Sequence, residues 1–183
     1  MYFAKKIYCY TTNNYFRGLQ HFNVKRPWLH VLFLLIFGLF AAITGFYAGI
    51  FHWNFEKSIF SPFYFLILFI FPSFLEESLF RGLLIPVETV KKGTVAIIKS
   101  TVFSSLIFAL WHPFNAFLFN PAARELFYNP FFLIIVFILG IFCSLSYIFS
   151  RSLWPAVIIH WVVVVVWWGF LDGRNLILQN LPF

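Results

Sequence analysis

Five long apolar stretches run through this sequence, and their length decides the solvent in which the chain can fold. They cover roughly residues 28–51, 59–86, 94–113, 130–150 and 153–171. A helix of about 20 apolar residues crosses the roughly 30 Å hydrocarbon core of a bilayer. Since 62% of the residues are hydrophobic and only 10% are charged, the chain also lacks the polar side chains needed to cover a soluble globule. The sequence therefore predicts an integral membrane protein.

Helices are the secondary structure that these stretches predict. Backbone polar groups inside a bilayer must be hydrogen-bonded internally, which restricts spanning structures to α-helices and closed β-barrels. None of the stretches alternates apolar and polar residues as a barrel strand does. We predict an all-α fold, a polytopic membrane helical bundle with about five transmembrane helices over residues 28–172. An amino-terminal interfacial segment, 1–27, precedes it, and a short tail, 173–183, follows it.

Two further features of the chain carry local predictions. Segment 113–129 is too short and too broken by proline to span the membrane, so it is predicted to be a loop or a surface helix. Gly45 and Gly49 form a GxxxG pair in the first apolar stretch, which lets two helix backbones approach closely. We expect this pair to pack within the bundle, with dimerisation as the alternative.

Basic residues outside the apolar centres predict the orientation in the membrane. Nine of them precede the first stretch or flank the connections after the second and fourth stretches: Lys5, Lys6, Arg17, Lys25, Arg26, Lys91, Lys92, Lys99 and Arg151. The opposite side carries only Lys57 and Arg124, with Arg174 in the tail. Cytoplasmic loops hold an excess of Lys and Arg, so the amino terminus is predicted to be cytoplasmic, in a plasma or inner membrane. The basic residues form no continuous face, and no nucleic-acid partner is expected.

Three charged residues interrupt the second apolar stretch, within FPSFLEESLFRGLLIP. Each uncompensated charge at this depth costs at least about 2.5 kcal/mol, so these residues require a partner or a function. Helical spacing places Glu77 and Arg81 on one face, at i and i+4, and turns Glu76 about 100° away. One carboxylate is predicted to pair with the guanidinium while the other faces a neighbouring helix. A salt bridge that only fixes packing is the alternative.

Two histidines lie at membrane depth, His112 late in the third stretch and His160 in PAVIIHWVVVVVWW. Taken singly, each can simply hydrogen-bond a neighbouring carbonyl. Together with Glu76 they predict a shared site. Counted from the charged turns at about 1.5 Å per residue, Glu76 and His112 lie near 20 Å and His160 near 13 Å. A shared site therefore requires a tilt or kink, and a water-filled cavity that opens toward the cytoplasmic side.

These residue types favour amide hydrolysis. A buried carboxylate can act as a general base toward water, and histidines can orient that water or donate to a developing oxyanion. Glu76, His112 and His160 are the candidate catalytic residues, with Glu77 and Arg81 in support. We expect no cofactor. Zinc held by Glu76, His112 and His160 is the second choice, because the ligands come from three helices and no HExxH pair is present.

The motifs resemble those of a known family. Three occur in the expected order: Glu76-Glu77-x-x-x-Arg81, Phe108-x-x-x-His112 and, later, His160. Over roughly residues 60–171 they are similar to the CAAX-protease and bacteriocin-processing (CPBP, or Abi) membrane proteins. The prenyl-protein endopeptidases of this family remove a C-terminal tripeptide after a lipidated cysteine, and its bacterial members are associated with bacteriocin processing or self-immunity.

The resemblance implies an α-helical intramembrane endopeptidase with a metal-free, glutamate-dependent mechanism. Its Glu76 would activate water and its histidines would line the site, and the substrate would be a peptide or a membrane-associated protein. One position departs from the family, because Val164 stands where the third motif usually has Asn or Asp. Asn115, one turn after His112, is a candidate substitute.

The departure at Val164 motivates an alternative function, a non-catalytic membrane interaction or immunity protein that retains the family scaffold. An ion or proton pathway is the third choice. It ranks last because the chain shows no paired, glycine-broken helices of the inverted-repeat kind.

Overall fold

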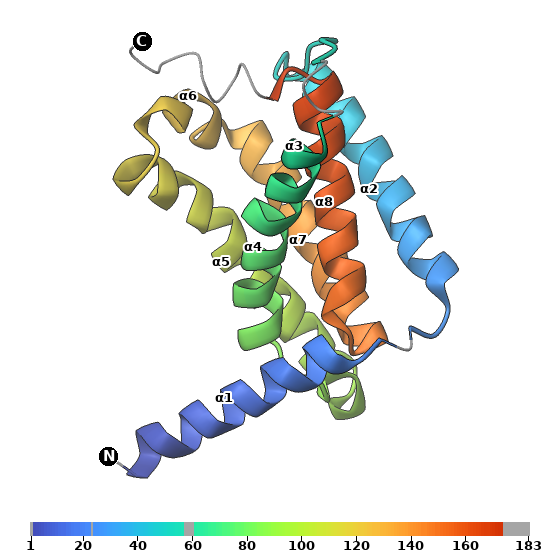
Figure 1. Ribbon diagram of the computed structural model, residues 1–183, viewed down its shortest axis with the longest axis vertical. Coiled ribbons are helices and arrows are strands. Elements are labelled where there is room, and N and C mark those ends of the chain that lie inside the picture. The colour runs from blue at the N-terminus through green and yellow to red at the C-terminus, as the bar shows by residue number, and fades with distance from the viewer. Residues whose placement is uncertain (1, 23, 57–60, 174–183) are drawn as a thin grey trace.

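The computed structural model describes residues 2–22, 24–56 and 61–173, with the backbone alone for residues 2–10. Lys57, Arg174 and the predicted tail from residue 174 on therefore lie outside the described residues. Five helices in the described part are long and apolar enough to cross a membrane: α2 (Pro27–Tyr47), Pro62–Leu83, α5 (Thr94–Leu118), α7 (Pro130–Ser150) and α8 (Leu153–Phe170). They form a bundle (Figure 1). The predicted all-α membrane fold is confirmed.

The second spanning segment, Pro62–Leu83, is the least regular, and we call it the broken helix. It consists of α3 (Pro62–Leu68), the π-helical η2 (Phe69–Phe74), α4 (Leu75–Glu77) and the π-helical η3 (Ser78–Leu83). Pro72 has no N–H to offer the carbonyl of Leu68 four residues earlier. The Ser73 hydroxyl donates to that carbonyl instead, at 2.8 Å. Both the break and its repair lie one turn before the predicted site, next to Phe71, whose backbone leaves helical geometry (φ −120°, ψ 120°).

Proline and capping side chains fix where the other helices begin. Pro27 and Pro130 stand in the first turn of α2 and α7, where a missing N–H costs nothing. The side chain of Asn129 accepts from the backbone N–H of Phe131, and that of Ser152 accepts from Trp154. These signals are local, which is why the predicted and observed starts agree within a few residues.

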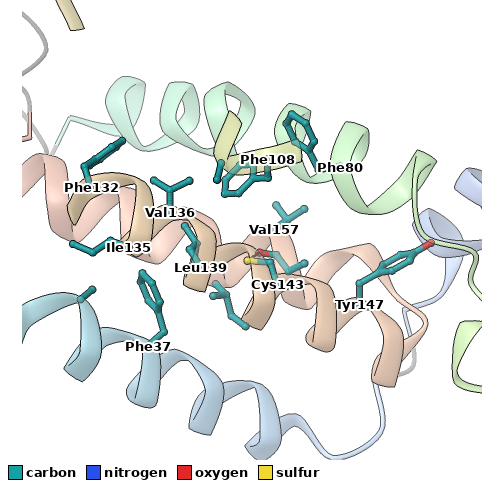
Figure 2. Packing of buried hydrophobic residues seen from close by; sticks show 14 of the residues in the cluster. Phe37, Phe80, Phe108, Phe132, Ile135, Val136, Leu139, Cys143, Tyr147 and Val157 are labelled. Atoms are coloured by element: carbon teal, nitrogen blue, oxygen red, sulfur yellow. Dashed lines mark hydrogen bonds between the residues drawn. The ribbon is translucent and has the colours of Figure 1, made fainter. Parts of the chain in front are cut away.

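The core is built around α7, which packs against α5, α8 and α2. Buried side chains of α2, α5, α7, α8 and the broken helix meet there (Figure 2). Helices α5 and α7 approach each other closely at Gly140, where an added Cβ would lie 2.9 Å from the Cβ of Ser105. Small residues at such crossings let two backbones come together without a hydrophobic driving force between them.

Shorter elements close the two ends of the bundle. Helix α1 (Tyr2–Gln20) runs across the end where α2 and α8 begin (Figure 1), next to the turn η4 (Thr89–Lys92). At the other end lie η5 (Pro121–Ala123) and α6 (Arg124–Phe127). There too, the backbone N–H of Asn54 donates to Phe170, which ties the chain after α2 to the end of α8.

Two sequence predictions about these ends are corrected. The third helix does not stop at residue 113 but continues through Pro113 to Leu118; the rest of segment 113–129 forms the short helices η5 and α6. The GxxxG pair is not a helix face, because α2 ends at Tyr47 and Gly49 lies in the following turn with φ +67°. Gly45 instead faces its own returning chain, where an added Cβ would lie 2.2 Å from the Phe51 ring.

Candidate active site

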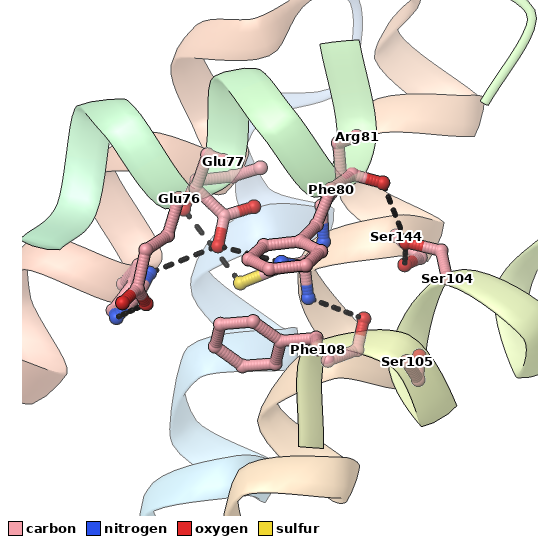
Figure 3. Close-up of polar contacts among 12 residues, drawn as sticks. Glu76, Glu77, Phe80, Arg81, Ser104, Ser105, Phe108 and Ser144 are labelled. Carbon is pink, nitrogen blue, oxygen red and sulfur yellow. Dashed lines mark hydrogen bonds and ion pairs between the residues drawn. The ribbon is translucent and has the colours of Figure 1, made fainter. Parts of the chain in front are cut away.

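The Glu77 carboxylate connects the broken helix to α8. Its Oε1 accepts from Arg81 Nη1 at 3.0 Å (Figure 3). The same oxygen accepts from His160 Nδ1 at 2.9 Å. Glu77 and Arg81 are completely buried and His160 nearly so. The predicted i, i+4 pair is therefore present, and it also orients a histidine from another helix.

Arg81 is held from further directions. Its Nη2 donates to the carbonyl of Gly140 at 3.1 Å, and its guanidinium carbon lies 4.4 Å from the centre of the Phe108 ring. A buried charge needs such compensation, because an unpaired one is costly in a low-dielectric interior. Phe108, the aromatic residue of the Phe108-x-x-x-His112 motif, therefore helps to stabilise the buried arginine.

Glu76 points to the other side, as its helical position predicts. Its Oε1 accepts from Trp111 Nε1 at 3.2 Å, and its Oε2 lies 3.9 Å from His160 Nε2. Within the described residues, Oε2 is buried without a hydrogen-bond partner. A separation of 3.9 Å is too long for a direct hydrogen bond and suits two groups that share a small polar molecule. Trp111 was missed by sequence reasoning, since a tryptophan in an apolar helix is ordinarily a packing residue; its only signal is its place beside His112.

The hydrogen bond to Glu77 fixes which nitrogen of His160 faces Glu76. An ionised carboxylate only accepts, so Nδ1 carries the proton in that bond. Nε2 is then the acceptor in the neutral ring and the second donor in the protonated ring. A carboxylate behind an imidazole sets its tautomer and orientation in the same way in many hydrolytic and metal sites.

The predicted difference in depth between Glu76 and His160 is absent. Glu76 lies seven residues before Leu83, where the broken helix ends, and His160 lies seven residues after Leu153, where α8 begins. The prediction was wrong because it counted from Lys91, although the chain between Leu83 and Lys91 leaves the helix. Measured from the true helix ends, the two side chains are level.

His112 lies on the other side of Phe108. Its Nδ1 donates to the carbonyl of Phe108 at 3.0 Å, and its ring centre is 5.2 Å from that of Phe108. The Phe108 ring is also 5.7 Å from the ring of His160. The structure thus links Arg81, Glu77 and His160 by hydrogen bonds and places Glu76 Oε2 3.9 Å from His160. His112 is linked to them through the Phe108 ring and the wall of a shared cavity.

That cavity has a volume of about 610 Å³ and is bounded by α2, the broken helix, α5, α7 and α8. Most of its wall is apolar. The residues in the wall with a titratable or amide side chain are Glu76, His112, Asn115, Asn120 and His160. A mostly apolar wall with a few polar groups is typical of ligand-binding cavities.

The cavity extends from Glu76 toward the end of the bundle opposite α1. Its lining includes Trp53, Asn120 and Leu171, which all lie at that end. On the α1 side the interior is filled by completely buried side chains, among them Tyr147 and Leu153. The lining residues therefore extend away from the Lys- and Arg-rich end, toward which the sequence predicted an opening, and packed side chains occupy that end.

Val164 and Asn115, the two positions singled out for a missing polar group, both border the cavity. Val164 is buried and packs with Leu68, so the departure from the family pattern falls at the site itself. Asn115 lies one turn beyond His112 on α5. No group of three or more His, Cys, Asp and Glu side chains is arranged to hold a metal ion in the part of the chain that the structure describes. The metal-free mechanism stays a prediction.

Comparison with known proteins identifies one family. A family model described as type II CAAX prenyl endopeptidase Rce1-like matches residues 58–166. No curated protein and no solved structure matches the chain. The matched stretch contains all five residues predicted for the site and begins after α1 and α2.

Proposed function

Because the chain belongs to the Rce1-like type II CAAX prenyl endopeptidase family, we propose that it is an intramembrane endopeptidase whose water nucleophile is activated by Glu76. Family membership and five spanning helices support a protease-like role in a membrane. The observation that carries the mechanism is the buried, unpartnered Oε2 of Glu76, which lies 3.9 Å from His160 Nε2 beside the cavity.

In the proposed reaction, Glu76 takes a proton from a water molecule while the water oxygen attacks the peptide carbonyl. The proton then passes to the leaving amine, which leaves the carboxylate as it began. His160, whose Nδ1 is bound by Glu77, uses Nε2 to orient the water or to donate to the oxyanion. His112 lines the site from the other side of Phe108. Glu77 and Arg81 position these groups and do not themselves react.

The proposed reaction uses no cofactor. A zinc ion at Glu76, His112 and His160 would need their donor atoms about 2.0–2.2 Å from one point. Removing zinc tests directly whether cleavage requires it. We expect cleavage to continue after prolonged dialysis against a zinc chelator. Loss of cleavage that returns on adding zinc would support the metal alternative.

The proposed substrate is a peptide, or the tail of a membrane-associated protein, with an apolar portion that lies in the cavity. It would enter from the end opposite α1, because the cavity lining extends that way. With the amino terminus in the cytoplasm, as the basic residues predict, this is the non-cytoplasmic side.

Labelling of single cysteines in cells tests this orientation. When each cysteine is introduced into the Cys9→Ser protein, a membrane-impermeant thiol reagent should label Asn120→Cys directly and Lys92→Cys only after permeabilisation. The reverse pattern would contradict the proposed orientation.

Substitution of Glu76 tests the function. Purified protein is incubated with internally quenched peptides that end in a Cys-aliphatic-aliphatic-X sequence, prenylated or not. Glu76→Gln preserves shape but cannot accept the proton, so cleavage should fall by at least about 10²-fold, while the unfolding temperature stays close to that of the wild type. The exposed Glu125→Gln is the matched control. Full activity of Glu76→Gln on a peptide that the wild type cleaves would rule out the mechanism.

Val164 favours a second candidate, a non-catalytic interaction or immunity protein that keeps the family scaffold. Loss of one oxyanion donor typically lowers a rate by about 10²–10³-fold. This candidate predicts that His160→Ala leaves the cellular phenotype unaltered, whereas the peptidase predicts its loss.

A further inference from the structure

Helix α1 lies outside the family match, yet it packs directly under the end of the broken helix. The contact is made by the second half of α1, beginning near Asn14. Because η3 follows Glu76 and Glu77 without interruption, anything that holds the end of η3 also holds these carboxylates.

Asn14 completes the backbone hydrogen bonding of this helix end. Its Nδ2 donates to the carbonyls of Gly82 at 3.2 Å and Ile85 at 3.0 Å, and its Oδ1 accepts from the N–H of Val87 at 2.6 Å. Terminal helical carbonyls lack partners of their own. The carbonyl of Gly82 is a special case, because the residue four positions later is Pro86, which has no N–H. The buried amide of Asn14 therefore supplies what the local sequence cannot.

Tyr15 adds a second contact, closer to the site. Its hydroxyl donates, at 3.3 Å, to the hydroxyl of Ser78, the residue that follows Glu77. Its ring fills the notch left by Gly82, where an added Cβ would lie 2.6 Å from Tyr15 Cδ2. The aromatic ring and the missing side chain fit together, so α1 sets the rotation of η3 about its axis.

The same face of α1 also contacts α8. The indole Nε1 of Trp154, in the first turn of α8, donates to the carbonyl of Leu19 at 2.9 Å. Helix α1 thus joins the two elements that supply Glu76 and His160. A catalytic pair must be held within about 0.5 Å of its productive geometry, and a displacement of 1 Å can cost about 10²-fold in rate. A helix interrupted by proline and π-turns does not provide this precision alone.

We propose that Asn14 and Tyr15 are positioning residues: from α1 they fix the depth and rotation of the broken helix, so that Glu76 and Glu77 both meet His160. The kinetic part of this inference rests on the proposed function. Its structural part does not, because the relation between η3 and α8 can be measured without any substrate.

The test compares Asn14→Ala with Asn13→Ala, the same substitution one position earlier at an exposed residue. With the quenched peptide, Asn14→Ala should lower kcat by about tenfold or more and leave KM within about twofold, because geometry is lost and binding is not. Tyr15→Phe, which keeps the ring and removes only the hydroxyl, should give a smaller loss in kcat. Asn13→Ala should behave like the wild type.

Nitroxide labels supply the readout that is independent of activity. Leu79→Cys on η3 and Ile158→Cys on α8 are both exposed, and Cys143 is buried; Cys9→Ser completes the background. The distance distribution between the labels should be narrow in the otherwise wild-type chain, broad with Asn14→Ala, and narrow with Asn13→Ala. If Asn14→Ala does not fold, Tyr15→Phe takes its place in both measurements.

The outcomes separate the two proposals. An unchanged distance distribution overturns the inference, and so does a broadened one with unchanged kcat. If the wild type cleaves no peptide while the distribution still broadens, the proposed function fails and the structural role of α1 stands.

Discussion

At the scale of single residues, Glu77 has a different role from the adjacent carboxylate, Glu76. It is completely buried and accepts hydrogen bonds from Arg81 and His160. Each carboxylate has one oxygen without a hydrogen-bond partner among the described residues, but of the two only Glu76 lines the cavity. The 100° between neighbouring positions of a helix is enough to turn one carboxylate toward Arg81 and His160 and the other toward the cavity.

Removal of the arginine tests how much this support contributes. Arg81→Met keeps the volume of the side chain but leaves the Glu77 carboxylate without its cation. Breaking a buried pair in this way costs about 3–5 kcal/mol, so the unfolding temperature in detergent should drop markedly. The exposed Lys92→Met, at the same end of the bundle, should change stability by less than about 0.5 kcal/mol. Equal stability of the two variants would show that Arg81 is not needed for the fold.

The crossing of α5 and α7 governs stability at the scale of helices. Gly140→Ala would place a Cβ 2.9 Å from that of Ser105 and 3.0 Å from its Cα, and backbone cannot move aside cheaply. Overpacking of this kind costs about 1–3 kcal/mol, measured as a lower unfolding temperature. Gly38→Ala in α2 is the matched control, because nothing lies within 4 Å of its added Cβ. If both variants unfold at the wild-type temperature, the crossing is looser than described.

Sequence patterns predicted the helices well where the signal was local. Apolar length predicted five spans, and each observed helix begins within a few residues of its predicted start. The prediction was wrong where a distant contact decides. Nothing near Pro113 in the sequence shows that α5 continues past it, and the end of α2 at Tyr47 depends on the chain folding back over Gly45.

At the scale of the whole molecule, the site too could be predicted from the sequence only where the signal is local. The Glu77–Arg81 pair is a matter of helical spacing, so it could be predicted from the sequence. The contact of Glu77 with His160 and that of Glu76 with Trp111 depend on how helices pack, and α1 carries no motif that points to its role. The side chains that fill the α1 end, Tyr147 and Leu153 among them, likewise belong to no motif, so the sequence could not show toward which end the cavity extends.

Ion pairs also connect α1 to the rest of the molecule. Glu88, in the connection after the broken helix, pairs with Arg17 of α1, with Lys91 at 2.8 Å and with Arg151 at 3.8 Å. Hydrogen bonds from Lys91 and then Arg17 hold the pKa of the Glu88 carboxyl below its ordinary value. Three segments of the chain therefore meet at one half-buried carboxylate.

This carboxylate gives the stability a predictable dependence on pH. Because the folded pKa is the lower one, the stabilisation is complete above the ordinary pKa of glutamate and is lost as the pH falls through the lowered value. The wild type should therefore unfold at a slightly higher temperature than Glu88→Gln at neutral pH, and the difference should shrink as the pH falls below the ordinary pKa of glutamate. Thermal scans of both proteins across that range check it. A difference that grows toward acid pH would have the wrong sign.

The Glu77–His160 bond has a consequence for how the protein is made. The broken helix leaves the ribosome well before α8, so for most of synthesis Glu77 has Arg81 beside it but no imidazole. Charged residues lower the tendency of such a segment to stay in lipid. We expect the early helices to be held only loosely until the last one arrives, so that a chain cut before Leu153 is recognised by quality-control proteases and degraded.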